Sequence, residues 1–221
     1  MRFKAVLFDL DGTLFDTAPD IMSACNRTLE AFGYPKLSSL RLRPKVGFGM
    51  RAMMRVALMP EHWNKCEIGS PMYEYFSNSY TSHICEETKP YEGIEEIIKN
   101  LHERGLHLGV VSNKYHRMIV SLFSHFPFTA CFESVLGADS CTHTKPHPEP
   151  ILKALQMLNV APYEAVYCGD SASDILAANR AGCVSCAVKW GYGQIDEDFD
   201  QLRADFTVSS PEEILKLISK D

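Results

Sequence analysis

Short apolar runs alternate with helix-like stripes along much of this chain. Residues 4–8, 106–111, 165–169 and 184–188 are apolar runs that predict buried strands, and 132–136 is a shorter candidate. Glycine, serine or aspartate follows several of these runs, as expected where a strand gives way to a turn. The pattern therefore predicts a sheet at the centre of the fold.

Helical periodicity fills the intervals between these strands. Apolar residues recur at helical spacing in 118–123, 148–158 and 172–181, and Gly182 is placed to end the last of these helices. Leu152 falls on the apolar face of the second. Strands that alternate with helices predict an α/β fold with a parallel sheet covered on both faces, a Rossmann-like arrangement of three layers.

Capping signals predict where two further helices begin. Thr17 and Asp20 have the spacing of a capping box at the start of a helix that Gly33 can end. Ser210 and Glu213 have the same spacing near the end of the chain. Between these signals, residues 38–85 are rich in Met, Arg and Tyr without a convincing strand, which predicts a small helical lobe.

Composition narrows the class of protein. The 221 residues are 46% hydrophobic and 23% charged, which is typical of a soluble globular chain. A net charge of -6 provides no basic excess for a nucleic acid, so we expect no nucleic-acid partner. No run has the length of a membrane span, and the N-terminus lacks a signal-peptide pattern; we expect no membrane partner and a cytoplasmic location.

Eight cysteines fit the same picture as free thiols in a reducing compartment. Cys183 and Cys186 have the CxxC spacing of a redox or zinc pair. No second such pair or nearby His pair accompanies them, and they fall immediately before and within the predicted strand 184–188. We interpret them as two small buried residues.

Polar side chains stand where four of the predicted elements end or begin. They are Asp9 and Asp11, Ser112 and Asn113, Lys145, and Asp170 with Asp174. Because parallel strands present their carboxyl ends at one edge of a sheet, these groups should converge although they are far apart in sequence. Taken singly, Asp170 could cap a helix, Ser112 could be a turn residue and Lys145 a surface lysine.

The residue types in this group indicate phosphoryl chemistry. Two neighbouring carboxylates repel each other unless a cation or a shared proton offsets the repulsion. Ligation by oxygen alone suits Mg²⁺, which commonly binds substrate phosphates as well. A lysine and a hydroxyl beside such an ion would neutralise and hold a phosphoryl group.

The same residues carry a resemblance to a known family. Phe8–Thr13 resembles the first motif of the haloacid dehalogenase superfamily, while Ser112, Lys145 and residues 169–174 match its second, third and fourth motifs. Within the superfamily, three stretches resemble phosphoglycolate phosphatases and their close relatives, namely residues 16–20, 89–93 and 145–150. The resemblance implies a catalytic core of residues 1–15 and 89–221, with an inserted helical cap of residues 16–88.

The resemblance also implies roles for the converging residues. Asp9 would attack phosphorus and become an aspartyl-phosphate, and Asp11 would act as general acid and then general base. Lys145 would pair with Asp9 and with the phosphoryl oxygens. Mg²⁺ would be held by the Asp9 carboxylate, the Asp11 backbone carbonyl and Asp170. Asp174 would support the metal site mainly through water or through hydrogen bonds in the second coordination shell.

Further residues would meet the substrate. Ser112 and the backbone amide of Asn113 would bind the transferring phosphoryl group. In the cap, a stretch rich in arginine surrounds Gly47 and Gly49, whose lack of a side chain allows close approach. Arg51 follows this loop and is our first candidate for the anionic end of the substrate, although a solvated basic surface is the ordinary explanation of such charge runs.

The predicted function is Mg²⁺-dependent hydrolysis of a small phosphate monoester, with 2-phosphoglycolate as the first candidate substrate. A phosphatase of another small metabolite, such as a sugar or nucleoside phosphate, and a β-phosphoglucomutase-like phosphomutase are alternatives. Asp11 argues against a dehalogenase, which need not keep an acid there. A non-catalytic binding relative is disfavoured because Asp9, Asp11, Lys145 and Asp170 are all present.

Overall fold

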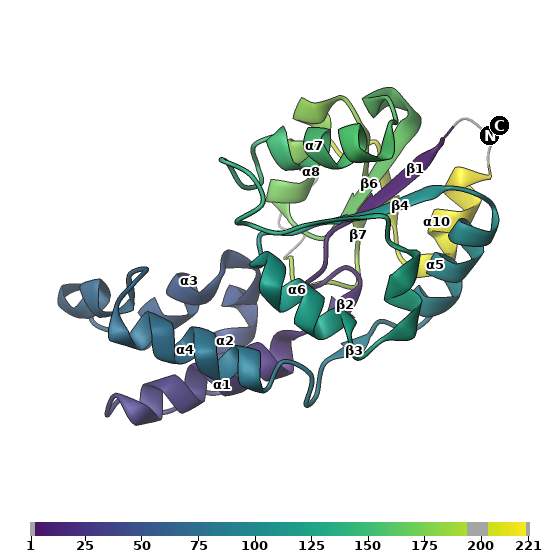
Figure 1. Ribbon diagram of the computed structural model, residues 1–221. Coiled ribbons are helices and arrows are strands. Elements are labelled where there is room, and N and C mark those ends of the chain that lie inside the picture. Colours follow the sequence, from purple (N-terminus) through teal and green to yellow (C-terminus); the bar gives the residue numbers. More distant parts are fainter. Residues whose placement is uncertain (1–2, 194–202, 220–221) are drawn as a thin grey trace. The chain divides into compact units, whose positions relative to one another are not determined.

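The protein divides into two compact units. The computed structural model describes residues 3–193 and 203–219 (Figure 1). The first unit, called the core unit below, comprises residues 1–16 and 90–221, and the second, the helical unit, comprises residues 17–89. The short strands β2 (Phe15–Asp16) and β3 (Lys89–Pro90) stand at the two places where the chain passes between them.

The core unit is built on one six-stranded sheet with the strand order β5-β4-β1-β6-β7-β8. All neighbouring strands run parallel. The strands are β1 (Ala5–Phe8), β4 (His107–Val111), β5 (Ser134–Leu136), β6 (Ala165–Gly169), β7 (Val184–Val188) and β8 (Phe206–Val208). The predicted α/β fold with a parallel sheet is therefore confirmed. The edge strand β8 was not predicted, because Phe206 and Thr207 are exposed and leave no apolar run.

Helices cover both faces of this sheet (Figure 1). They are α5 (Ile94–Glu103), α6 (His116–Phe123), α7 (Glu149–Leu158), α8 (Ala172–Ala181) and α10 (Pro211–Ile218), with short 3-10 turns at Pro127–Cys131 and Pro162–Glu164. Helices α7 and α8 pack together over one face, and α5 and α10 pack together over the other. Gly182 ends α8 with a φ of 79°, as predicted. Leu152, however, is 40% exposed, and Ala154 is buried on α7 instead.

The helical unit contains helices and turns over residues 17–88. They are α1 (Ala18–Ala31), α2 (Ser39–Leu42), a 3-10 helix (Arg43–Phe48), α3 (Met50–Arg55), a 3-10 helix (Pro60–Cys66) and α4 (Pro71–Ser82). Helix α1 packs along α4, and Arg27 Nε donates a hydrogen bond to Ser79 Oγ at 2.8 Å between them.

The two capping boxes expected from sequence do not form. Thr17 provides no side-chain cap for α1, and Asp20 faces the end of the same unit instead. The Asp20 carboxylate accepts hydrogen bonds from the amides of residues 86–88 at 2.9–3.1 Å and from Thr88 Oγ1 at 2.7 Å. At α10, Glu213 accepts from the Ser209 amide, one residue before the expected cap. In the folded protein, the carboxylates of Asp20 and Glu213 therefore accept hydrogen bonds from groups other than the expected cap residues.

Among residues 3–193 and 203–219, none of the helices has both the length and the apolar character that a bilayer crossing requires.

Asp20 joins the beginning of the helical unit to its end. We predict that Asp20→Ala lowers the free energy of unfolding by about 2 kcal/mol or more, because the buried amide and hydroxyl of Thr88 lose their acceptor. The measurement is the urea midpoint followed by circular dichroism. Glu30→Ala is the matched control, since Glu30 lies on the same helix in an exposed pair with Lys36. Equal midpoints for the two variants would contradict the prediction.

Candidate active site

The ends of the central strands bring the predicted polar residues together. Strand β1 lies between β4 and β6, with Phe8 opposite Val110 and Cys168. The Asp9 amide extends this ladder by donating to the Cys168 carbonyl at 2.9 Å. The residues that follow each of these strands therefore come out at the same edge of the sheet.

Lys145 is the centre of this cluster. Its Nζ atom donates to Asp9 Oδ1 at 2.8 Å, to Asp174 Oδ1 at 2.6 Å and to the Tyr167 hydroxyl at 2.7 Å. All four side chains are buried. One ammonium group therefore links the end of β1 to the first turn of α8.

Asn113 holds the backbone of this lysine in place. Its side chain accepts from the Lys145 amide and donates to the Lys145 carbonyl, both at 3.0 Å. A side-chain amide that pairs with both backbone groups of one residue fixes that residue much as a neighbouring strand does. The structure therefore gives the Asn113 side chain a supporting contact, beyond the backbone role that we predicted.

Asp170 is held by a loop to which sequence reasoning gave no role. The amides of Tyr192 and Gly193 donate to Asp170 Oδ2 at 2.7 and 3.1 Å. Glycine is required around this carboxylate: a Cβ at Gly12, where φ is +86°, would lie 2.2 Å from Asp170 Oδ2. A Cβ at Gly191 would lie 2.3 Å from the same atom. The Gly-Tyr-Gly sequence after β7 was the available signal.

Asp174 is fully occupied by neighbours. Its Oδ1 atom accepts from Lys145, and its Oδ2 atom accepts from the Ser171 amide at 3.0 Å and the Ser171 hydroxyl at 2.5 Å. This is a capping box at the start of α8. In contrast, among residues 3–193 and 203–219 no donor reaches Asp9 Oδ2 or Asp170 Oδ1.

The charges in this cluster do not balance. When Asp9, Asp170 and Asp174 are ionised, three negative charges face the one positive charge of Lys145, which leaves two. Burial and the neighbouring Asp174 raise the pKa of Asp9 to about 6 despite Lys145, and burial with the same neighbour raises that of Asp170 to about 7. Burial alone would lower the pKa of Lys145, but its carboxylate partners raise it.

The donor set fits a hard divalent cation. Oxygen atoms of Asp9, Asp170 and Asp174 lie within 4.8 Å of one another. A divalent ion would cancel the two excess negative charges, and carboxylate oxygens are the ligands that Mg²⁺ prefers. Because both oxygens of Asp174 are engaged, Asp9 and Asp170 are the side chains with atoms available for direct ligation.

Two further residues of the site were missed from the sequence. Tyr167 lies inside β6 and was counted as an apolar strand residue, but its hydroxyl accepts from Lys145 and donates to the Val111 carbonyl at 2.8 Å. Lys114 directly follows the predicted Ser112 and Asn113, and its Nζ atom lies 2.6 Å from Asp11 Oδ1. Ser112 itself is buried and accepts from the Lys114 amide at 3.3 Å.

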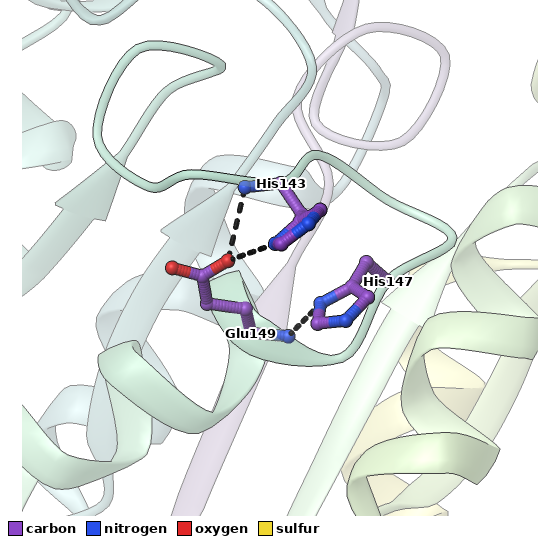
Figure 2. A group of neighbouring side chains, drawn as sticks. All are labelled: His143, His147 and Glu149. Atoms are coloured by element: carbon purple, nitrogen blue, oxygen red, sulfur yellow. Dashed lines mark hydrogen bonds and ion pairs between the residues drawn. The ribbon is translucent and has the colours of Figure 1, made fainter.

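A second group of possible metal ligands lies on the surface near Lys145 (Figure 2). Glu149 accepts from the amides of Thr142 and His143 at 3.1 and 2.9 Å and from His143 Nδ1 at 2.8 Å. The His147 ring stacks on His143, with 4.2 Å between centroids. Hydrogen bonds, the one from the His143 ring first, lower the pKa of Glu149 to about 2. These hydrogen bonds fix the loop before α7, which accounts for the grouping of the three side chains.

The predicted specificity residues lie in the helical unit. Gly47 belongs to the 3-10 helix before α3, and Gly49 precedes α3 with a φ of 82°. Arg51 is on α3, where its guanidinium pairs with Glu67 at 2.9 Å, and Arg55 contacts the same carboxylate. Their part in substrate binding stays a prediction.

A family model and the similar proteins of known sequence agree on the family to which this chain belongs. Residues 6–188 match a family model described as haloacid dehalogenase-like hydrolase. A phosphoglycolate phosphatase of Chromobacterium violaceum is 35% identical, over 98% of this chain and 97% of the relative. An N-acetylmuramic acid 6-phosphate phosphatase of Pseudomonas aeruginosa is 33% identical, over 100% of this chain and 96% of the relative.

Solved structures resemble the whole chain as well. A crystal structure described as a predicted phosphoglycolate phosphatase from Haemophilus somnus superposes with a TM-score of 0.86 at 26% identity, covering 98% of each chain. A crystal structure described as that of a predicted phosphatase, from Clostridium acetobutylicum, superposes with a TM-score of 0.81 at 26% identity. It also covers 98% of each chain.

The raised pKa values predict how a cation stabilises the protein. A carboxyl group whose pKa is raised on folding contributes stability below its unfolded pKa, and that contribution is lost as the pH rises through the folded value. Between about pH 4 and pH 7 the metal-free protein should therefore lose stability through Asp9 and Asp170. Mg²⁺ should raise the melting temperature more at about pH 8 than at about pH 5.5, because protons compete with it at low pH.

Asp170→Asn is the diagnostic variant for this prediction. It removes one repelling charge while keeping the side-chain shape, so the metal-free variant should melt at a higher temperature than the metal-free parent at pH 8 and should respond less to Mg²⁺. Differential scanning calorimetry with and without Mg²⁺ provides both values. A shift on adding Mg²⁺ that is equal at the two pH values would contradict the assignment.

Proposed function

Since this chain belongs to the haloacid dehalogenase-like hydrolases and is a phosphomonoester hydrolase, we propose that it hydrolyses a small metabolite phosphate, first of all 2-phosphoglycolate, through an aspartyl-phosphate on Asp9. The observation that carries the proposal is the buried contact of Lys145 with both Asp9 and Asp174 at the strand ends. This contact orients the Asp9 carboxylate, one oxygen of which would attack phosphorus.

The first step transfers the phosphoryl group to the protein. An oxygen of Asp9 attacks phosphorus, and the bond between phosphorus and the ester oxygen breaks. The carboxyl proton of Asp11 moves to that oxygen, so that the alcohol leaves neutral. Lys145 lies 2.8 Å from Asp9 Oδ1, where it orients the nucleophile and offsets charge on the phosphoryl oxygens.

The second step releases phosphate. Asp11, now ionised, takes a proton from water as the water oxygen attacks phosphorus, and Asp9 is regenerated as the leaving carboxylate. Ser112 and the Asn113 amide hold the phosphoryl group through both steps. Burial of this edge of the sheet makes each of these hydrogen bonds stronger than it would be in water.

Mg²⁺ is the proposed cofactor. Asp9, Asp170 and the Asp11 carbonyl would hold it, while Asp174 keeps Lys145 and the first turn of α8 in place. When bound, the ion would supply two positive charges, which would offset the excess negative charge of the carboxylates beside the phosphate. The cluster carries two uncompensated negative charges, which supports a divalent ion in this role.

The substrate is the finer part of the proposal. Several relatives at 29–35% identity are named phosphoglycolate phosphatase, and three sequence stretches resemble that group. A second candidate, N-acetylmuramic acid 6-phosphate, which is a sugar phosphate that carries a carboxylate, is favoured by the similarity to the phosphatase named for that compound. Both compounds join a phosphate monoester to a carboxylate, so an acid-bearing alcohol is the leaving group that both candidates share.

The reaction class is tested with Asp9→Asn, which keeps the size of the side chain but removes the nucleophile. We expect phosphate release from 2-phosphoglycolate to fall by about 10⁴-fold or more with Mg²⁺ present, with the circular dichroism spectrum unchanged. Glu103→Gln, on the exposed surface of the core unit, is the matched control and should keep full activity. Substantial hydrolysis by Asp9→Asn would overturn the mechanism.

The substrate is tested with a panel that compares 2-phosphoglycolate, N-acetylmuramic acid 6-phosphate, sugar phosphates and a nucleoside monophosphate by kcat/KM. The proposal expects one of the two carboxylated esters to lead. A simple sugar phosphate or a nucleotide in first place would contradict it while leaving the mechanism standing.

Arg51 provides a prediction about the carboxylate of the substrate. If its guanidinium exchanges Glu67 for that carboxylate, Arg51→Ala should raise KM for the preferred ester about tenfold and change kcat little, the signature of lost ground-state binding. Arg41→Ala in the same unit is the control, because Arg41 donates to the Val56 carbonyl. An unchanged KM would remove Arg51 from the site.

A further inference from the structure

Lys114 is a buried lysine that neither the sequence motifs nor the proposed mechanism uses. Its side chain is 4% exposed, and its Nζ atom lies 2.6 Å from Asp11 Oδ1. The Asp11 side chain is 22% exposed, so the pair sits at the boundary between the buried cluster and solvent. The acid of the proposed mechanism therefore has a cation on one of its two oxygens.

The backbone that carries Lys114 is tightly packed. Its carbonyl accepts from the Ala138 amide at 2.8 Å, and its amide donates to Ser112 Oγ at 3.3 Å. A Cβ on Gly137 would lie 2.6 Å from the Lys114 carbonyl, so this turn tolerates no side chain there. The backbone of Lys114 is thus fixed by contacts that do not involve Asp11.

Stability alone does not account for a lysine at this position. Removing an ammonium group from water is costly, and an apolar side chain of similar volume often serves a buried position as well as an ion pair does. The orientation of Asp11 is what an apolar residue could not supply. A carboxyl group keeps one oxygen as an acceptor even when it is protonated, so a donor on Oδ1 leaves the proton on Oδ2.

We propose that Lys114 is a positioning residue for Asp11, holding Oδ1 so that Oδ2 presents its proton to the ester oxygen. The inference rests on the proposed function, in which that proton leaves Asp11 as the bond from phosphorus to the ester oxygen breaks. Lys114 neither gives nor takes the proton. It is therefore needed most where the leaving group needs the proton most.

Leaving-group dependence tests this role with Lys114→Met. An alkyl phosphate such as 2-phosphoglycolate releases a strongly basic alkoxide unless it is protonated, whereas p-nitrophenyl phosphate releases a weak base without help. We expect kcat/KM, which reports the steps up to departure of the alcohol, to fall about 30-fold or more for the alkyl ester. For the aryl ester it should fall less than about threefold.

Four further variants separate positioning from a structural role. Lys114→Arg keeps a cationic donor and should restore part of the alkyl activity. Asp11→Asn should show the same selective loss, and adding Lys114→Met to it should cost little more, because both act on one proton transfer. Lys99→Met, which breaks an exposed pair with Glu95, is the matched control and should leave both substrates unaffected.

The outcomes distinguish a failure of this inference from a failure of the proposed function on which it rests. Equal losses of kcat/KM on both esters, or a raised KM with unchanged kcat, would overturn the positioning role and would indicate a structural or substrate-binding lysine. The urea midpoint of Lys114→Met should stay close to the parent's. A parent enzyme that hydrolyses neither ester would overturn the proposed function itself, whereas an active parent with equal losses overturns only the inference.

Discussion

The active-site edge of the core unit depends on one buried ammonium group. Lys145 contacts Asp9 at the end of β1, Asp174 in the first turn of α8 and the hydroxyl of Tyr167 inside β6. Without a cation at this point, two carboxylates would be buried facing each other, which is among the most costly arrangements a fold can contain. The hydrogen bonds of Asn113 to the Lys145 backbone show how firmly the fold secures this position.

Lys145 neutralises only one of the three carboxylate charges in the cluster. The two remaining negative charges are the basis of the proposed cation binding. Burial, together with repulsion by Asp174, raises the pKa values of Asp9 and Asp170, and a bound divalent ion would offset the cost of ionising both carboxyl groups. The loop that carries Tyr192 and Gly193 holds Asp170 in position by backbone donors. Function and stability are therefore opposed at this edge, as is common where a site is prepared for a charged ligand.

The sequence predicted regular elements well and long-range partners poorly. Strands 165–169 and 184–188 were placed to the residue, because short and largely apolar runs between turn residues leave little choice. The cap expected from Asp20 failed because residues 86–88 use its carboxylate, and no local pattern reveals a partner so far along the chain. Lys114 was missed because its burial is decided by packing, and the role of the Tyr167 hydroxyl was missed because the strand pattern does not reveal which groups that hydroxyl contacts.

The central claim is that Asp9 is the phosphorylated carboxylate beside a divalent ion shared with Asp170. The most direct measurement is a crystal structure grown with Mg²⁺ and beryllium fluoride, which mimics a phosphoryl group on a carboxylate. We predict beryllium bonded to an Asp9 oxygen, Lys145 facing the fluorides, and Mg²⁺ about 2.1 Å from oxygens of both Asp9 and Asp170. Beryllium on another residue, or Mg²⁺ bound away from this pair, would contradict the account.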